Sequence, residues 1–227
     1  MVCRVAAFWI LVVVAAVAAA ADWVAVATTD TRLEYAAKPA VLAALTAAAA
    51  VIPAGQIDLN DRRWWFVAAL VCCLAGDVLL MLPHDLFIPG LAAFLVGHVL
   101  FIVGLAQPPS PPGVPPFSFA APGLVVASLV VVAVEAVPGT VLVRALVRNG
   151  QRALIPPVGL YVVAIVTMVV LAINVGSTVA ALGAAFFLLS DTLLAVGRFV
   201  RPVPQGSLAV HVTYHLAQVL LVLSLVR

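Results

Sequence analysis

Two aspartates stand inside apolar runs that are long enough to cross a bilayer, and they are the residues best placed to do chemistry. They occupy equivalent positions in two short segments, Gly76-Asp77-Val78-Leu79-Leu80 and Ser190-Asp191-Thr192-Leu193-Leu194. An aspartate near the centre of a membrane helix costs about 2.5–3.5 kcal/mol, so it must be paired, lined with water or used. Two carboxyl groups in one low-dielectric cavity can divide the roles of proton donor and base. We therefore predict that Asp77 and Asp191 are catalytic. The alternative is a structural pair, in which each acid binds Lys38 or an arginine and locks the helices together.

The composition predicts an all-α, polytopic membrane protein. The 227 residues are 66% hydrophobic and 9% charged, and the mean hydropathy is +1.26. A soluble globular domain needs more polar surface than this. The net charge of +2 is too small to indicate a nucleic-acid partner. Three cysteines do not pair evenly, and the adjacent Cys72 and Cys73 are interpreted as small packing residues. We expect one integral membrane domain over residues 1–227, in the cell membrane.

Hydropathy predicts eight membrane spans, at about residues 5–26, 37–53, 64–82, 87–107, 119–137, 154–173, 177–197 and 207–226. The first span resembles a signal peptide in its small residues before Asp22, but it is long and has Trp9 and Trp23 near its two ends. Tryptophans at both interfaces are typical of a spanning helix, with a cleaved signal peptide as the alternative.

Three local features shape the connections between these spans. Proline is favoured in the first turn of a helix, so Lys38-Pro39 is predicted to begin the second span. Six prolines between Gln107 and Phe117 predict an extended loop over residues 107–117. Arginines at a spacing of four, Arg144, Arg148 and Arg152, predict a short helix lying on the lipid surface.

The remaining polar residues of the spans gather toward one end of the bundle. Asp77 and Asp191 lie near the exits of the third and seventh spans, Lys38 begins the second, and Tyr161 and Tyr214 come early in the sixth and eighth. These helix ends belong to the same side of the membrane when the spans alternate in direction. Unrelated spans would scatter their polar residues over both sides. The convergence predicts one polar cavity that opens to one side.

Histidines and Lys38 admit both a functional and a structural interpretation. His98, in the middle of the fourth span, is either a packing residue or part of the site. A polar stripe on the eighth span, which either lines the cavity or joins helices, comprises His211, Tyr214, His215 and Gln218. Three histidines and two aspartates could together hold a metal, but we predict neither a metal nor a cofactor. Lys38 either binds a phosphate at a helix start or extends to the membrane interface.

In order along the chain, five motifs resemble those of the YhhN family of membrane lysoplasmalogenases. They reach from the second span to the eighth and are Tyr35-x-x-Lys38-Pro39, Gly76-Asp77-x-x-Leu80-Met81, Phe87-x-x-Gly90-Leu91-x-x-Phe94 with Gly97-His98-x-x-Phe101, Ser190-Asp191-x-x-Leu194-Ala195, and Tyr214-x-x-x-Gln218. Two positions depart from the family pattern: Ala40 stands where leucine is expected, and Phe101 replaces a tyrosine. The family pattern does not fix His215, which we interpret as a lining residue.

The resemblance implies hydrolysis of the vinyl-ether bond of a lysoplasmalogen, giving a fatty aldehyde and glycerophosphoethanolamine or glycerophosphocholine. It implies Asp77 and Asp191 as the catalytic pair, and a lysophospholipid and membrane lipids as partners. The substrate-binding residues implied are Tyr35, Lys38, His98, Ser190, Tyr214 and Gln218. Nothing in the sequence indicates an oligomeric state. A function of another class would be proton-coupled transport of a small amphiphile with the same two acids, which would need access from both sides of the membrane.

Overall fold

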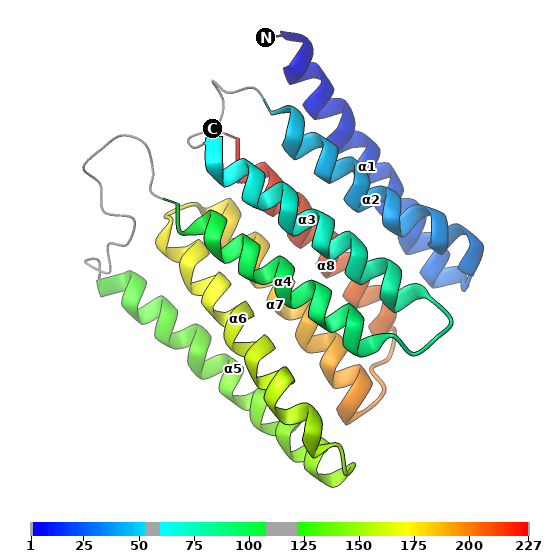
Figure 1. The fold of residues 1–227 in the computed structure, drawn as a ribbon, viewed down its shortest axis with the longest axis vertical. Helices are drawn as coiled ribbons and strands as arrows, with labels where there is room; N and C mark the ends of the chain where they lie inside the picture. Colours follow the sequence, from blue (N-terminus) through cyan, green and yellow to red (C-terminus); the bar gives the residue numbers. More distant parts are fainter. Residues whose placement is uncertain (1, 53–59, 108–121, 227) are drawn as a thin grey trace.

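A computed structural model describes residues 2–52, 60–107 and 122–226, and over these ranges the chain is a bundle of long α-helices without strands. Figure 1 shows them running roughly parallel or antiparallel. The helices are α1 (Val2–Thr28), α2 (Thr31–Val51), α3 (Asn60–Met81), α4 (Phe87–Leu105), α5 (Pro122–Arg148), α6 (Ile155–Asn174), α7 (Thr178–Ala195) and α8 (Gly206–Leu223). A 3₁₀ turn, η2 (Arg152–Leu154), precedes α6, and a π-helical turn, η3 (Val196–Val200), follows α7.

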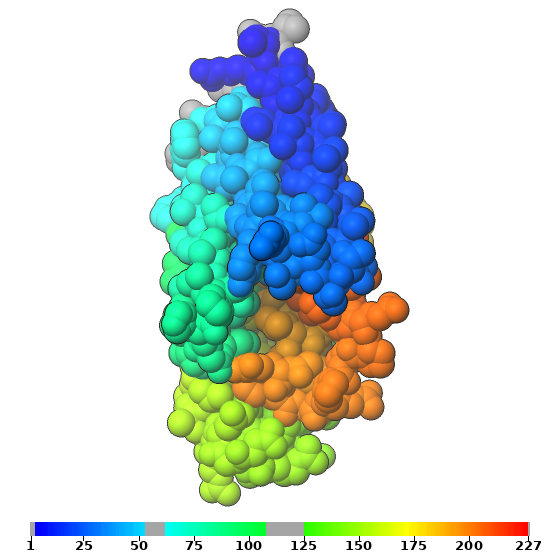
Figure 2. Space-filling model, turned by 90° about the vertical axis from the view of Figure 1, so that its right-hand side faces the viewer, coloured from blue at the N-terminus to red at the C-terminus, as the bar shows by residue number. Residues whose placement is uncertain are grey.

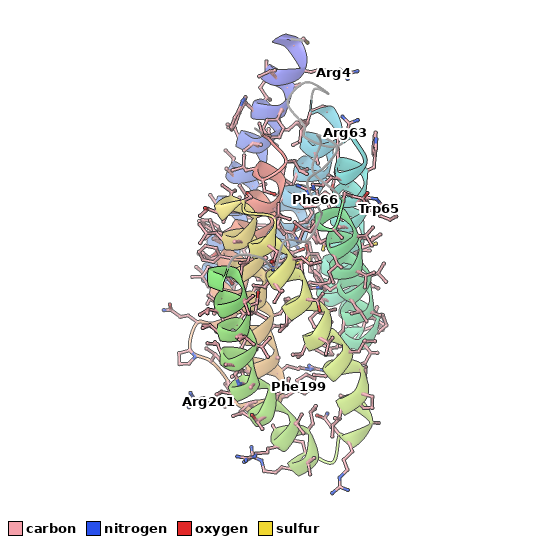
Figure 3. All side chains as sticks on the ribbon, turned by 90° about the vertical axis from the view of Figure 1, so that its left-hand side faces the viewer. Arg4, Arg63, Trp65, Phe66, Phe199 and Arg201 are labelled. Carbon is pink, nitrogen blue, oxygen red and sulfur yellow. The ribbon has the colours of Figure 1, made fainter. Side chains whose placement is uncertain are left out.

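Seven of the described helices are long and apolar enough to cross a membrane. The exception is α2, whose first half carries Arg32, Glu34 and Lys38. The chain is a multi-pass integral membrane protein, and the predicted all-α bundle of membrane helices is confirmed. Arg4 and Arg63 lie toward one end of the molecule and Arg201 toward the other, as Figure 3 shows.

Neighbouring helices in the chain mostly pack side by side, and α8 closes the arrangement. It contacts α7, α1 and α2, so the last described helix touches the first. The α6 helix contacts α4, α5 and α7. At the edge of the bundle, α5 packs on α6 and η3 and is the least buried of the described spans (Figure 1). The helices α2, α3, α7 and α8 then surround the polar interior of the bundle.

Glycines let α3 and α4 approach each other closely. Gly90, Gly97 and Gly104 recur every seven residues on α4 and face Leu80, Cys73 and Phe66, which recur at the same interval on α3. At all three glycines an added Cβ would lie within 3 Å of the facing side chain. Small residues at such positions are the usual means by which membrane helices pack, since lipid provides no hydrophobic drive for association. The tight α3–α4 pair fixes Asp77 and His98 relative to each other.

We expect Gly97→Ala to destabilise the protein by roughly 1–3 kcal/mol, the usual cost of overpacking a filled core. The new Cβ would lie 2.9 Å from Cys73 Sγ and 3.3 Å from the Ala69 carbonyl oxygen, and the carbonyl belongs to the backbone and cannot rotate away. Thermal inactivation of the purified protein in detergent measures the effect. Gly159→Ala is the matched control, because an added Cβ at that position on α6 meets nothing within 4 Å. Equal stability of the two variants would contradict the packing argument.

Two predicted helix boundaries are wrong, both next to a proline. The Asp30 carboxylate accepts hydrogen bonds from the Arg32 and Leu33 amides and begins α2 at Thr31, so Lys38 and Pro39 lie inside the helix. Likewise, α5 continues through Pro138 to Arg148, and no separate helix lies on the lipid surface there. Its last turns are held by burial of Leu142 and Leu146 against neighbouring helices. The predicted loop 107–117 lies, except for Gln107, outside the described residues.

Candidate functional site

A cavity of about 570 Å³ lies between α2, α3, α7 and α8 and contains both aspartates. Its lining includes Thr31, Glu34, Met81, Pro202 and Val203, which belong to helix starts, helix ends and the α7–α8 connection on one side of the bundle. Figure 2 shows a hollow on this face, bordered by the blue N-terminal helices and the orange α7–α8 segment. The predicted gathering of polar residues around one cavity is confirmed for Lys38, Asp77, Asp191 and Tyr214. It is wrong for Tyr161, which does not line this cavity.

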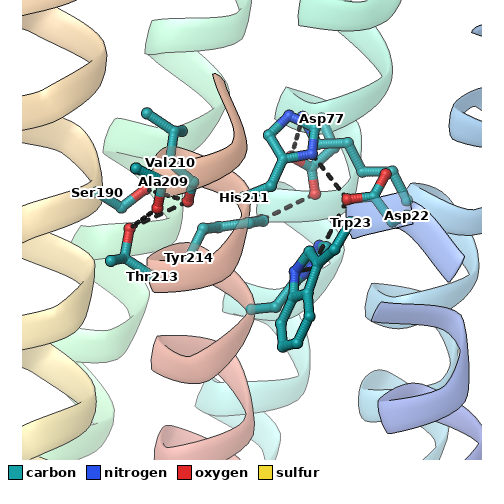
Figure 4. Close-up of polar contacts among 11 residues, drawn as sticks. Asp22, Trp23, Asp77, Ser190, Ala209, Val210, His211, Thr213 and Tyr214 are labelled. Atoms are coloured by element: carbon teal, nitrogen blue, oxygen red, sulfur yellow. Dashed lines mark hydrogen bonds and ion pairs between the residues drawn. The ribbon is translucent and has the colours of Figure 1, made fainter. Parts of the chain in front are cut away.

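Asp77 is buried and held by two partners. It is 1% exposed, and its Oδ1 lies 3.5 Å from Nζ of Lys38, which is itself buried. The Tyr214 hydroxyl donates to Asp77 Oδ2 at 2.9 Å (Figure 4). Lys38 reaches this position because the early start of α2 places it two turns inside the helix. Lys38 therefore lies beside the Asp77 carboxylate, and it does not stand at the amino-terminal end of a helix as predicted. The nearby ammonium group offsets part of the free-energy cost of burying a charged carboxylate.

Asp191 has different neighbours. The Tyr161 hydroxyl donates to Asp191 Oδ2 at 2.7 Å, and His98 Nε2 lies 3.5 Å from the same oxygen. His98 Nδ1 lies 2.7 Å from the Phe94 carbonyl oxygen, and a carbonyl can only accept, so Nδ1 must carry a proton and donate it. In the neutral ring Nε2 therefore has no proton, and its lone pair faces the Asp191 carboxyl group. A proton bound to His98 Nε2 or to Asp191 Oδ2 could therefore lie between the imidazole and the carboxyl group.

The other predicted binding residues take distinct places around the cavity. Tyr35 is half exposed at the mouth. Ser190 lines the wall, but its hydroxyl donates to the Val210 carbonyl oxygen at 3.1 Å, which ties α7 to α8. His98 is fully buried behind Asp191 and does not line the cavity. Gln218 is also fully buried outside the lining, one turn from Tyr214 along α8. Of these residues, Tyr35 is the most accessible to a molecule entering the cavity.

A buried polar group on the α1 side of the cavity was not predicted from the sequence. Asp22 of α1 is fully buried, and its Oδ2 lies 2.7 Å from His211 Nδ1 and 3.9 Å from His215 Nδ1 (Figure 4). Trp23 Nε1 donates to His215 Nδ1 at 3.1 Å. His211 lines the cavity, so this group reaches the same space as Asp77 and Asp191. The sequence contains a signal for this group, because Asp22 is the only acid in the predicted first span. The small residues before Asp22 also resemble the end of a signal peptide, which obscures that signal.

The same group has a spacing that metal-binding helices use. His211 and His215 form a His-x-x-x-His pair on one face of α8, which was not among the predicted motifs, and Asp22 faces both. Within residues 2–52, 60–107 and 122–226, however, no three His, Cys, Asp or Glu side chains are grouped so that they could hold an ion. His215 Nδ1 already accepts from Trp23, which leaves that atom without a lone pair for a metal.

Comparisons with known proteins agree with the motif order. The model of the YhhN family matches residues 33–225. The chain is 35% identical to the protein named lysoplasmalogenase TMEM86B of Homo sapiens, over 70% of this chain and 62% of that protein. It is 35% identical to a protein named lysoplasmalogenase of Mycobacterium tuberculosis, over 76% of this chain and 62% of the relative. The chain thus spans about three fifths of the length of these curated relatives. No solved structure matches it.

Proposed function

The chain belongs to the YhhN family, and from this premise we propose that it hydrolyses the vinyl-ether bond of lysoplasmalogens. The products would be a fatty aldehyde and glycerophosphoethanolamine or glycerophosphocholine. The observation that carries the proposal is the presence of two buried carboxyl groups with different partners in one cavity. The names of the human and mycobacterial relatives support the choice of substrate.

Hydrolysis of an enol ether needs a proton donor first and water second. Protonation of the double-bond carbon farther from oxygen gives an oxocarbenium ion, and water then adds at the carbon bound to oxygen. The hemiacetal so formed loses the glycerol oxygen as an alcohol and leaves an aldehyde. One water is consumed and the proton is returned, so no cofactor or redox partner is needed for the balance. Glycosidases solve a similar problem with one carboxylic acid and one carboxylate.

The neighbours of the two aspartates support a division of these roles. Asp77 faces Lys38, so it would remain a carboxylate that stabilises the cation and orients water. Asp191 has the uncharged Tyr161 hydroxyl and His98 ring beside it and no cation, so its carboxyl group would carry the proton that is donated to carbon. Tyr161 would then stabilise the carboxylate that the transfer leaves behind. Lys38 has three N–H donors and can hold Asp77 and a substrate phosphate oxygen together.

The proposal is tested with purified protein in liposomes that contain a 1-alkenyl lysophosphoethanolamine. Release of fatty aldehyde is the expected result, and the saturated 1-alkyl ether should remain intact, because it has no double bond to protonate. A carrier would behave differently, since it would exchange labelled lipid across the liposome without converting it. The cavity mouth on one side of the bundle favours the enzyme. Exchange without aldehyde formation would overturn the proposal.

We expect Tyr161→Phe to lower turnover by about 10–100-fold. This variant removes the hydroxyl that donates to Asp191, and a hydrogen bond to a charged group contributes roughly 1.5–3 kcal/mol. The substrate contacts elsewhere in the cavity are unchanged, so the Michaelis constant should stay nearly the same. Thr167→Val is the matched control, because it removes an exposed hydroxyl from the same helix. Equal turnover of both variants and the wild type would show that the Tyr161 bond has no part in the reaction.

A further inference from the structure

Asp191 also borders a second pocket, which lies between α4, α5, α6 and α7 and is mostly apolar. Its volume is about 60 Å³, and its walls include Leu91, Leu142, Val158, Ile165 and Leu188. Asp191 and Leu194 line this pocket and the large polar cavity alike, so the two spaces adjoin at these two residues of α7. Asp191, Tyr161, Thr192 and the half-buried Glu135 are the polar residues of the lining. The function described above gives no role to this space.

We propose that the apolar pocket holds the first carbons of the hydrocarbon chain of the lipid substrate. The identity of that lipid rests on the proposed function, but the binding of a single-chain lipid does not. The polar cavity, with Lys38 and Asp77, would take the phosphate and glycerol, and the chain would pass Asp191 into the pocket.

The chemistry of a vinyl ether requires such a junction. The ether oxygen belongs to the glycerol side of the molecule, while the carbon that accepts the proton is the second carbon of the hydrocarbon chain. A proton donor must therefore stand where the polar space ends and the apolar path begins. In the described residues Asp191 is the only acid that lines both spaces. Asp77 lines the polar cavity alone, which agrees with its assignment to the cation and water.

The size of the pocket and the position of α5 indicate where the rest of the chain goes. An engineered apolar cavity of about 150 Å³ binds one benzene molecule, so a pocket of about 60 Å³ has room for only a few carbons. The remaining carbons would leave along α5, which is the least buried of the described spans and faces lipid over most of its length. A long chain would then stay in the bilayer, and only the atoms near the reacting bond would enter the protein.

Gly139 offers a direct test, because it lines the pocket and an added Cβ there meets nothing within 4 Å. Gly139→Leu would add four carbons at this wall of the pocket, and the first of them, Cβ, meets no neighbouring atom within 4 Å. A pocket filled or emptied by one methylene changes discrimination by roughly 10–200-fold, so the Michaelis constant for a C16 vinyl ether should rise at least about tenfold. A substrate whose chain ends at the vinyl carbons should be hydrolysed as before. Gly159→Leu is the matched control, since a Cβ added at Gly159 also meets nothing within 4 Å and Gly159 lines neither pocket.

A second measurement does not depend on hydrolysis. A saturated 1-O-alkyl lysophosphocholine with a diazirine at the fourth chain carbon, bound to the wild-type protein, should label α5 or α6 next to the pocket. Gly139→Leu should abolish this labelling and Gly159→Leu should leave it unchanged. Labelling of α2 or α3 instead, or equal behaviour of the two leucine variants, would overturn the inference. If no vinyl ether is cleaved at any chain length, the proposed function fails while the labelling still decides the pocket. If Gly139→Leu does not fold, the position of the label in the wild-type protein and its change in Gly139→Ala decide whether the hydrocarbon chain occupies the pocket.

Discussion

Asp191→Asn is expected to lower turnover of a vinyl-ether lysophospholipid by about 10²–10⁴-fold, the usual contribution of a general acid. Asparagine keeps the size of the side chain and can still accept the Tyr161 hydrogen bond through its amide oxygen. It cannot give a carboxylic proton to carbon. The substrate should bind nearly as well, because the contacts of its phosphate and chain are unchanged. The loss should therefore appear in kcat and leave the binding of a stable alkyl-ether analogue intact.

The outcome separates catalysis from structure when protein quality is measured on the same sample. A catalytic Asp191 predicts normal expression, a monodisperse elution profile and little aldehyde. A structural Asp191 predicts poor expression with near-normal turnover in the protein that survives, and this pattern would remove Asp191 from the mechanism. Combining Asp191→Asn with Asp77→Asn adds a further check. When two residues act as a unit, replacing the second causes little further loss of activity. The double variant should therefore be hardly slower than the slower of the two single variants.

Lys38→Met and Asp77→Asn should have different effects on stability and the same effect on turnover. Lys38→Met leaves the Asp77 carboxylate buried without its cation, which costs roughly 3 kcal/mol, the low end for a broken buried pair because the cavity is open to water. Asp77→Asn removes the negative charge itself and leaves Lys38 near the cavity, where water can solvate it. We therefore expect a larger loss of thermal stability from Lys38→Met. Both variants should lose about 10²–10⁴-fold in turnover.

The double variant Lys38→Met/Asp77→Asn makes this prediction decisive. It contains neither charge, so its thermal stability should return toward that of the wild type. Turnover should remain at the level of Asp77→Asn, because the carboxylate that stabilises the cation is still missing. Recovery of turnover together with stability would mean that the pair is only structural. The Tyr214 hydroxyl can donate to either side chain at position 77, so it does not confound the comparison.

The location of the site could be derived from the sequence because a few polar residues in an apolar chain carry a large energetic penalty. Once the spans are placed, the cost of exposing Asp77 and Asp191 to lipid brings them to one interior space. Helix limits near Pro39 and Pro138 were harder to predict. Neighbouring helices in a membrane can stabilise the turns around a proline, so the residue does not mark a helix end as it does in water.

Lateral contacts between distant helices are the part that the sequence does not reveal. The contact of Asp22 with His211 joins residues 189 positions apart, and no periodicity in either helix indicates its partner. The same holds for Tyr161, whose bond to Asp191 depends on how α6 packs beside α7. Each residue was visible as polar, but its partner follows from three-dimensional packing alone.

The contact between Asp22 and His211 also has a consequence for biosynthesis. During translation α1 enters the membrane before α8 is made, so Asp22 is at first without the histidine that it contacts in the folded protein. Burying an aspartate in a membrane helix without a hydrogen-bond partner is unfavourable, so α1 should be fully stabilised only after α8 packs against it. Insertion of α8 then supplies His211 to Asp22 and Tyr214 to Asp77 in one step. Ribosome-bound chains stalled before α8 should therefore leave Asp22 accessible to water or to the insertion machinery.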